Sequence, residues 1–574
     1  MENQLLKVKD LRIAFNTEGR INEVIKGIDL NINRGEIIGL VGESGSGKSV
    51  TGLSLLGLLP ADNAKITGSI EYNHEGKTKQ LIGLEDNLFR KIKGKSISMI
   101  FQEPMSSLNP VFTCGYQVDE MTRLHLKYSK QQAKDATLDF FKKVGLPEPL
   151  RIYNSYPHQI SGGQIQRVMI AMAISCHPDL LIADEPTTAL DVTIQKKILD
   201  LLVNIRDEFG ISILFISHDL GVIRSITSRV NVMYKGSILE EGLTEEVLKH
   251  PKHLYTHGLI ACKPPLYQKL ERLPVVSDFV NISDRDGSLA FTQNEDKKSL
   301  ERKHLVTPDR DAEPILRVEN LTVKYPLKKN FWGKTTNYLN AVDDLSFSIQ
   351  KGESLGVVGE SGCGKSTLGR TLVHLEQAAS GKAFLYGKEL FSQSESAWKQ
   401  TAKKIQIIFQ DPYSSLNPKM KVGEAIMEPI IVHNLFKTKQ ERTSRLHSLL
   451  DQVGLLKEHA GRYPHEFSGG QRQRISIARA LALEPELLIC DESVAALDVS
   501  VQSQVLNLLK DLKEELGLSL LFITHDMSVV NFIADRIFVM NQGKIMESGV
   551  TQDVINSPQN DYTKRLVEAI PNWA

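Results

Sequence analysis

The sequence predicts an α/β protein made of two tandem copies of one domain, each with a mainly parallel sheet at its core. The first observation is a repeat. The segment Phe101-Gln102-Glu-Pro-Met-Ser-Ser-Leu-Asn-Pro110 returns as Phe409-Gln410-Asp-Pro-Tyr-Ser-Ser-Leu-Asn-Pro418. The second is that, within each copy, short apolar runs alternate with stretches of helix length. This alternation is typical of parallel strands joined by helices.

Composition excludes several classes of protein. The chain has 574 residues, of which 41% are hydrophobic and 24% charged, as in ordinary globular proteins. Lys and Arg together number 69, as do Asp and Glu, so we expect no nucleic-acid partner. We also expect no signal peptide and no direct membrane span, because no apolar run approaches the roughly 18 residues required. Five cysteines without CxxC spacing indicate a reducing compartment and no cysteine-ligated cluster.

The spacing of the repeats sets the expected domain limits. Lys48 and Lys365 are 317 residues apart, whereas the two glutamates of the acidic pairs described below are 307 apart. The first copy therefore carries extra residues, which we place in a surface loop around Asn73 to Asn87. We expect a first domain at 1–262, a linker with a short helix at 263–313 and a second domain at 314–574.

Four kinds of element are expected in each copy. Apolar strands precede a Gly-rich loop, an acidic pair and a His-Asp pair, and a helix lies between the last two strands. The strands are Ile37–Val41, Leu180–Ala183 and Ile213–Ile216 in the first copy, and Ser354–Val358, Leu487–Cys490 and Leu520–Ile523 in the second; the helices are Gln195–Phe209 and Gln502–Leu516. Ligands of such sheets bind beyond the carboxyl ends of the strands, where these motifs fall.

The Gly-rich loops predict two phosphate sites. Gly42-Glu-Ser-Gly-Ser-Gly-Lys48-Ser49 and Gly359-Glu-Ser-Gly-Cys-Gly-Lys365-Ser366 match GxxxxGK[ST], the P-loop, between a strand and a helix. Their glycines let backbone N–H groups converge on phosphate oxygens, and the lysines reach the β- and γ-phosphates. We therefore predict ATP and Mg²⁺ as cofactors of a P-loop NTPase. The predicted binding residues are Gly42, Gly45, Gly47, Lys48, Ser49, Gly359, Gly362, Gly364, Lys365 and Ser366, with Ser49 and Ser366 as Mg²⁺ ligands.

The acidic and His-containing strand ends predict the catalytic groups. Asp184 and Asp491 suit the Mg²⁺ shell. Glu185 and Glu492 suit the residue that polarises the attacking water, since a carboxylate can accept its proton. His218 and His525 end the next strand, within reach of a γ-phosphate. We predict Glu185, Glu492, His218 and His525 as catalytic.

A further pair of motifs resembles the signature of the ATP-binding-cassette (ABC) ATPases. These are Ser161-Gly162-Gly163-Gln164 and Ser468-Gly469-Gly470-Gln471. The resemblance implies an α-helical subdomain in each copy and two cassettes packed head to tail. Each signature would then bind the γ-phosphate held by the opposite P-loop. One composite site would join Lys48 to Ser468, and the other Lys365 to Ser161.

The same resemblance assigns more site residues. Gln102 and Gln410 look like the Q-loop glutamines, which contact Mg²⁺ and sense the transmembrane partner. Phe15 and Tyr325 are candidates for the aromatic ring that stacks on adenine. Ala189-Leu190-Asp191 and Ala496-Leu497-Asp498 look like D-loops.

Two segments narrow the resemblance to the oligopeptide/dipeptide/nickel importer ATPases. One is the Ser-Ser-Leu-Asn-Pro stretch after each Q-loop glutamine, and the other is the Tyr-Thr tail at Tyr255 and Tyr562. The resemblance implies the ATP-hydrolysing motor subunit of an importer, with peptides as the leading cargo. It would be peripheral at the cytoplasmic face of the inner membrane. Its partners would be two integral-membrane permease subunits and an extracytoplasmic substrate-binding protein.

The sequence alone leaves alternatives open for the function and for the cargo. A tandem-cassette translation factor acting on the ribosome has a similar layout, but usually a long basic hairpin as its linker, whereas this linker has prolines and mixed charge. Nickel, opines, glutathione-like tripeptides and peptide antibiotics also remain open as cargo. The copies differ in Ile165 against Arg472 and in Pro186-Thr187 against Ser493-Val494, and we expect both sites to be competent.

Overall fold

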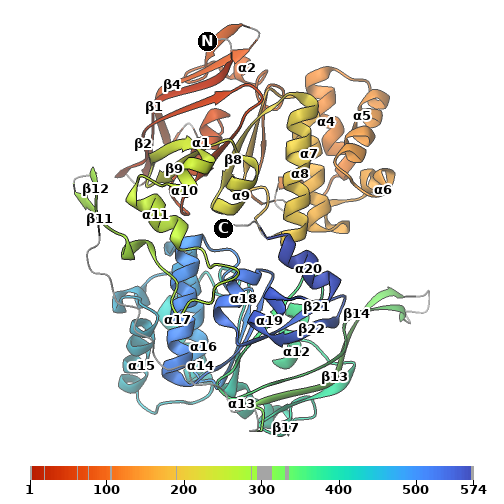
Figure 1. The fold of residues 1–574 in the computed structure, drawn as a ribbon, viewed down its shortest axis with the longest axis vertical. Coiled ribbons are helices and arrows are strands. Elements are labelled where there is room, and N and C mark those ends of the chain that lie inside the picture. The colour runs from red at the N-terminus through yellow and green to blue at the C-terminus, as the bar shows by residue number, and fades with distance from the viewer. Residues whose placement is uncertain are drawn as a thin grey trace.

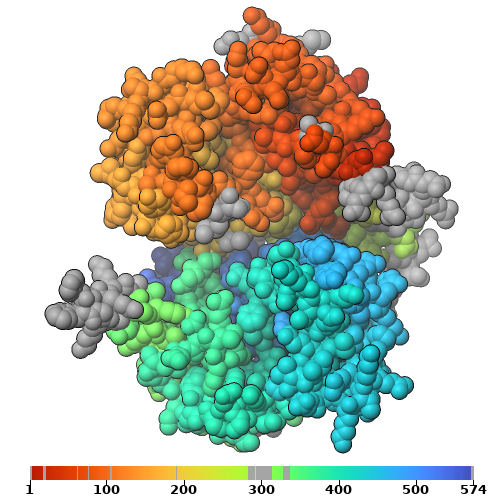
Figure 2. Space-filling model, turned by 180° about the vertical axis from the view of Figure 1, so that it is seen from behind, coloured from red at the N-terminus to blue at the C-terminus, as the bar shows by residue number. Residues whose placement is uncertain are grey.

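The computed structural model consists of two similar halves that follow one another along its long axis (Figure 1). The structure describes residues 3–17, 20–60, 62–74, 76–103, 107–188, 190–285, 288–293, 313–329 and 335–570. Seen as a surface, the halves are two lobes that meet at a waist (Figure 2). Among the described residues, no helix is long and apolar enough to cross a membrane.

Each half is built on a six-stranded, mainly parallel sheet, which confirms the predicted fold class. In the first half the strand order is β10-β9-β3-β8-β7-β6, and only β10 runs antiparallel to its neighbour. The strands are β3 (Ile37–Val41), β6 (Ile97–Ile100), β7 (Leu180–Asp184), β8 (Ser212–Ser217), β9 (Arg229–Tyr234) and β10 (Ser237–Leu243). The central strands are buried along their whole length, so both faces require apolar side chains.

The second half repeats this sheet in the order β18-β19-β20-β15-β21-β22. Its strands are β15 (Ser354–Val358), β18 (Ile405–Ile408), β19 (Leu487–Asp491), β20 (Ser519–Thr524), β21 (Arg536–Asn541) and β22 (Lys544–Val550). The six strands expected from sequence are all present and agree with the structure to within one residue at each end.

A four-stranded antiparallel sheet covers one side of each core. The strands are β1 (Gln4–Thr17), β2 (Arg20–Asn33), β4 (Ala64–His74) and β5 (Lys77–Gln80) in the first half, and β13 (Leu316–Lys329), β14 (Thr335–Ile349), β16 (Ser380–Leu385) and β17 (Lys388–Glu389) in the second. The β4–β5 hairpin is longer than the β16–β17 hairpin. Part of the extra length of the first copy therefore lies in this hairpin, which overlaps the expected segment only from Asn73 onward.

Helices fill the remaining layers. Those that follow the strands are α1 (Lys48–Leu55), α8 (Val192–Phe209), α9 (Leu220–Ile226), α10 (Thr244–Lys249) and α11 (Leu254–Ala261), and in the second half α12 (Lys365–Leu372), α17 (Val499–Leu516), α18 (Met527–Ile533), α19 (Thr551–Asn556) and α20 (Asp561–Glu568). The expected helical subdomains are α4 (Cys114–Leu126), α5 (Lys130–Lys143), α6 (Pro149–Asn154) and α7 (Gly162–Ile174), and α14 (Val422–Val432), α15 (Lys439–Gln452) and α16 (Gly469–Leu481). Helix α8 begins earlier than expected because Asp191 caps it, accepting a hydrogen bond from Ile194 N at 2.8 Å.

The described part of the linker packs on both halves. Its first stretch lies on the second half, where Leu273 is fully buried in the core cluster. Asn507 of α17 holds that stretch through two hydrogen bonds to the Leu273 backbone, of 2.9 and 2.8 Å. The chain then forms a hairpin of β11 (Val280–Arg285) and β12 (Ser288–Gln293), and Phe291 packs on His253 of the first half. The short helix expected in this linker is limited, among its described residues, to the three-residue 3-10 helix Val276–Asp278, and residues 294–312 lie outside the described residues.

Replacing Asn507 with Ala is expected to loosen this contact. The substitution leaves a buried N–H and a buried C=O of Leu273 without partners, which costs about 2–3 kcal/mol of folding free energy. Thermal unfolding of the full chain measures the loss. The matched control is Asp511→Ala, which removes an exposed ion pair with Arg272 and should change stability by less than about 0.5 kcal/mol. Equal effects of the two substitutions would show that Asn507 does not anchor the linker.

Candidate functional site

The two P-loops have the backbone shape that phosphate binding requires. Gly47 and Gly364 stand directly before α1 and α12 with φ of +105° and +106°. A Cβ would lie 2.5 Å from Ile25 Cδ1 at Gly47 and 1.9 Å from Ala341 O at Gly364, so both positions require glycine. Each loop therefore leads into a helix N-terminus whose free N–H groups and dipole favour an anion.

The P-loop lysines are buried and turned back over their own loops. Lys48 Nζ donates to the carbonyl oxygens of Gly42 and Glu43 at 2.8 and 2.9 Å. Lys365 Nζ donates to those of Gly359 and Glu360, both at 2.8 Å. Burial lowers the pKa of Lys48, although the nearby carboxylates of Glu185 and Asp498 oppose that effect. The ammonium groups thus stand at the centre of each loop, next to where phosphate oxygens would lie.

A serine and an aspartate converge beside each P-loop. Ser49 Oγ donates to Asp184 Oδ1 at 3.0 Å, and Ser366 Oγ donates to Asp491 Oδ1 at 2.7 Å. Asp491 Oδ2 is buried and has no hydrogen-bond partner among the residues that the structure describes. Burial, with a smaller effect of Glu185, raises the pKa of Asp184 to about 6. Oxygen donors of this kind, one of them unsatisfied, fit a hard divalent cation such as Mg²⁺.

The glutamates that follow these aspartates are held toward the same place. Gln102 Nε2 donates to Glu185 Oε2 at 2.9 Å, and Gln410 Nε2 donates to Glu492 Oε2 at 2.7 Å. Burial raises the pKa of Glu185, but hydrogen bonds and positive charge from His218 and Lys48, with Thr188, outweigh it and lower the pKa to about 2. Glu185 is thereby kept ionised. The structure brings the Q-loop glutamine, the glutamate and the His together at both strand ends.

Both glutamates have a strained backbone. Glu185 and Glu492 have φ of +46°, a left-handed conformation that residues other than glycine seldom adopt. Their N–H groups donate to Ile216 O and Ile523 O on the neighbouring strands, at 3.0 and 2.9 Å. Strain of this kind costs about 1–3 kcal/mol and persists where the surroundings fix it, often at active sites.

The signature serines stand at the exposed N-termini of two otherwise largely buried helices. Ser161 caps α7 and Ser468 caps α16, and in each case the glutamine three residues later completes a reciprocal capping box. The Gly-Gly pairs lie in the first turn, so free N–H groups point out of the helix end. This geometry suits an incoming anion.

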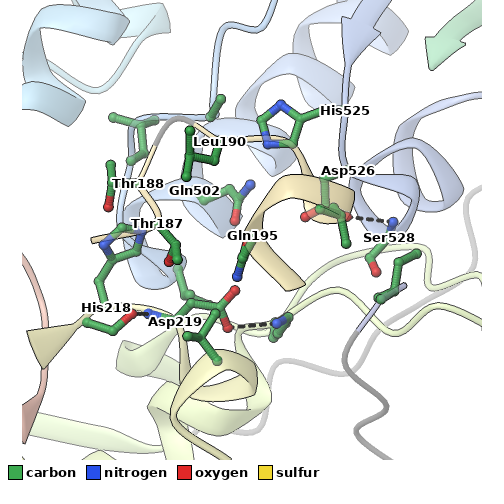
Figure 3. A pocket seen from close by; sticks show the side chains of 18 of the residues that line it. Thr187, Thr188, Leu190, Gln195, His218, Asp219, Gln502, His525, Asp526 and Ser528 are labelled. Atoms are coloured by element: carbon green, nitrogen blue, oxygen red, sulfur yellow. Dashed lines mark hydrogen bonds and ion pairs between the residues drawn. The ribbon is translucent and has the colours of Figure 1, made fainter. Parts of the chain in front are cut away.

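The halves meet at the predicted D-loop of the second half. Ser44 N of the first P-loop donates to Asp498 Oδ2 of the second half at 3.3 Å, and Val499 joins the core cluster of the first half. Figure 3 shows His218 and Asp219 facing His525 and Asp526 across a shared cavity of about 110 Å³. Among the described residues, no hydrogen bond joins Ser161 or Ser468 to the opposite P-loop, so the composite sites remain a prediction. Ala189 lies outside the described residues.

Comparison with known proteins identifies the family. A protein-family model described as "ABC transporter" matches residues 25–188 and 342–495, more than half of the chain. The chain belongs to the ABC transporter ATPases. A second model, "Oligopeptide/dipeptide transporter, C-terminal region", matches residues 239–284 and 546–574, the tails of the two cassettes.

Relatives of this ABC ATPase align along almost its whole length. It is 43% identical to the glutathione import ATP-binding protein GsiA of Pectobacterium atrosepticum over 99% of this chain and 90% of the relative. It is 45% identical to the protein of that name from Salmonella choleraesuis, over 99% of this chain and 89% of the relative. A solved ATP-binding cassette, MJ0796 bound to ADP and Pi, is 26% identical and covers 41% of this chain and 98% of its own, with a TM-score of 0.38.

These matches confirm that the chain contains two fused ABC cassettes and that it is an ATP-binding ATPase. Nothing in the comparisons favours the ribosomal alternative. The roles of individual residues rest on geometry and motif.

The two candidate adenine-stacking rings lie in different settings. Phe15 of β1 packs against the core cluster of the first cassette. Tyr325 of β13 lies near the side chains of Thr367, in the helix after the second P-loop, and Glu376. Both rings are partly buried. Their role in adenine binding remains a prediction.

The tail tyrosines are functional candidates that sequence reasoning used only as family markers. Tyr562 Oη accepts a hydrogen bond from Glu360 N in the second P-loop at 3.1 Å. Tyr255, its counterpart, is fully buried and lies beside the Glu43 backbone, but among the described residues its hydroxyl has no partner within the geometric limits of a hydrogen bond. The tail of the second cassette therefore braces the P-loop, a contact between segments about 200 residues apart.

This difference predicts unequal effects of removing the two hydroxyls. Tyr562→Phe leaves Glu360 N without its acceptor and is expected to cost about 1–2 kcal/mol of stability. Tyr255→Phe removes an unsatisfied buried oxygen and should be neutral or slightly stabilising. Thermal unfolding of each full-length variant is the measurement. A loss at Tyr255 as large as that at Tyr562 would contradict the assignment.

Proposed function

We propose that this chain is the ATP-hydrolysing motor subunit of an ABC importer for peptides, with glutathione-type tripeptides as the leading cargo. The observation that carries the proposal is the 43–45% identity, over 99% of the chain, to proteins named for glutathione import. The oligopeptide/dipeptide tail region present in both cassettes supports the same class of cargo.

The proposed chemistry is ATP hydrolysis at two sites. P-loop amides, with Lys48 or Lys365, bind the phosphates, and Glu185 or Glu492 accepts a proton from the attacking water. His218 and His525 would contact the γ-phosphate. Mg²⁺, when bound, neutralises charge that develops on the phosphates. It would be held by Ser49, Gln102 and Asp184 at one site and by Ser366, Gln410 and Asp491 at the other.

The proposed composite sites explain how ATP could drive motion. ATP bound at one P-loop would also be contacted by the opposite signature, Ser468-Gly469-Gly470-Gln471 or Ser161-Gly162-Gly163-Gln164. A ligand that contacts both cassettes favours the state in which they are closed. Hydrolysis to ADP and phosphate removes the bridge, so the cassettes can part.

The proposed partners are two permease subunits and an extracytoplasmic substrate-binding protein, with the chain peripheral to the inner membrane. An exposed apolar surface beside the first Q-loop supports a permease contact. Val111 is 69% exposed, and the rings of Phe112 and Tyr116 are exposed and stacked, with centroids 5.0 Å apart. Large apolar side chains gathered on a surface in this way typically mark a protein interface.

Affinity purification of the tagged full-length chain in a mild detergent tests the proposal. Mass spectrometry is expected to identify two polytopic membrane proteins in amounts equal to the chain. Their disappearance with Val111→Asp plus Phe112→Asp, in a chain that still hydrolyses ATP, would place the contact on this surface. Recovery of ribosomal proteins without a permease would overturn the importer assignment and leave the ATPase chemistry intact.

A further inference from the structure

The two catalytic glutamates are held differently, although the cassettes share one fold. In the first cassette a single oxygen, Glu185 Oε2, faces three donors. They are Gln102 Nε2 at 2.9 Å, Thr188 Oγ1 at 2.9 Å and His218 Nδ1 at 3.1 Å. A carboxylate oxygen has two lone-pair sites, so this oxygen is fully occupied by the protein.

In the second cassette the corresponding carboxylate is less constrained. Among the described side chains, Glu492 Oε2 accepts one hydrogen bond, from Gln410 Nε2 at 2.7 Å. His525 Nδ1 is 3.7 Å from the other oxygen, and within the described part of the chain this buried nitrogen has no hydrogen-bond partner. Lys365 Nζ lies 3.8 Å from that same oxygen.

One substitution between the cassettes accounts for the missing donor. The third residue after the glutamate is Thr188 in the first cassette and Ala495 in the second. The backbone turn is the same in both, because Thr188 N donates to Glu185 O at 3.2 Å and Ala495 N donates to Glu492 O at 3.1 Å. The cassettes therefore differ here in the side chain and not in the path of the chain. Thr188 lies at the interface cavity, on the side of His218 (Figure 3).

The loops that carry His218 and His525 also differ, and again the loop of the first cassette is held by an extra contact. Asp219, which follows His218, accepts a hydrogen bond from Lys263 Nζ at 2.8 Å. Ile570 stands at the position of Lys263 in the second cassette, where it cannot make such a bond. Lys263 and Ile570 both line the interface cavity. The linker thus holds the first His loop through a contact that has no counterpart among the described residues of the second cassette.

A carboxylate accepts a proton from water only through a lone pair that faces the water. Three donors on Oε2 fix the orientation of the Glu185 carboxylate, so its other oxygen, Oε1, cannot turn toward the water without breaking one of these contacts, and the break adds to the barrier. We propose that the two ATP sites hydrolyse ATP at different rates because their side chains differ. Thr188 is a positioning residue that holds Glu185 in a slow site, whereas Ala495 leaves Glu492 free in a fast one. The inference rests on the proposed role of the two glutamates.

Exchange of the two residues tests the inference in the full-length chain, with ATP as the probe. With Glu492→Gln in place, Thr188→Ala is expected to raise kcat about fivefold, the effect of losing one hydrogen bond, with KM for ATP unchanged. Thr188→Ser keeps the hydroxyl and should retain the low rate. With Glu185→Gln in place, Ala495→Thr should lower kcat by a similar factor.

Three outcomes would overturn the inference. They are an unchanged kcat in Thr188→Ala, an equal response of the Ala and Ser variants, and a fall in kcat on removing the hydroxyl. If either single glutamate variant shows no measurable ATP hydrolysis, Thr188→Ala and Ala495→Thr are introduced into the unmodified chain. There Ala495→Thr should slow hydrolysis and Thr188→Ala should not, and equal losses would overturn the inference. Wild-type rates in both single glutamate variants would instead refute the proposed role of the glutamates, and the inference with it.

Discussion

A chain that carries both Glu185→Gln and Glu492→Gln is expected to lose ATP hydrolysis while it still binds ATP. The amide that replaces each carboxylate cannot accept a proton from the attacking water, so the rate should fall at least about 100-fold, the lower end of what a general base contributes. The glutamine retains the shape of the glutamate, and the P-loop contacts of Lys48 and Lys365 do not depend on it. Phosphate release and retention of labelled ATP after gel filtration measure the two properties.

The matched control is Glu246→Gln with Asp553→Asn, which removes the same number of charges from equivalent exposed positions in α10 and α19. This variant should hydrolyse ATP at the unmodified rate. Undiminished hydrolysis in the Glu185→Gln, Glu492→Gln chain would refute the assignment of both glutamates as bases. Loss of ATP binding together with hydrolysis would show that they act in nucleotide binding.

Replacing both P-loop lysines with Ala is expected to abolish ATP binding at working concentrations. A charge-assisted hydrogen bond is worth about 1.5–3 kcal/mol, so each site should weaken about 10- to 150-fold. Lys48 and Lys365 are only 5% and 3% exposed, and little else in either loop carries positive charge to the phosphates. Equilibrium dialysis with labelled ATP measures the affinity.

The Lys48→Ala, Lys365→Ala chain is compared with the glutamate variant, which should keep its affinity. Arg at these positions is not expected to restore binding, because its planar fork differs from a compact ammonium. Unchanged ATP affinity in the alanine variant, with thermal unfolding confirming a folded chain, would refute the phosphate role of the lysines.

The sequence was most informative where the chain is locally regular. The strand Ile37–Val41 and its repeat Ser354–Val358 agree with the structure at both ends, because each is a short buried run that ends at a glycine turn. The Ser-Gly-Gly-Gln motifs fall at helix starts for the same reason: serine and glutamine form a capping box within four residues.

Contacts between distant segments could not be predicted in this way. Tyr562 meets Glu360 from a helix near the chain end, and Asn507 meets Leu273 across more than 200 residues. Such pairs depend on tertiary packing and leave no periodic pattern in the sequence.

The claim that ATP joins the two cassettes is tested most directly by a distance measurement between them. Spin labels are placed at Lys142→Cys in α5 and Ser444→Cys in α15, two exposed positions, while all five native cysteines are buried. In the Glu185→Gln, Glu492→Gln chain, ATP is expected to shorten and narrow the distance distribution between the labels, and ADP is expected to leave it unchanged. A distribution that ATP does not change, in a chain shown to bind two ATP molecules, would contradict composite sites closed by nucleotide.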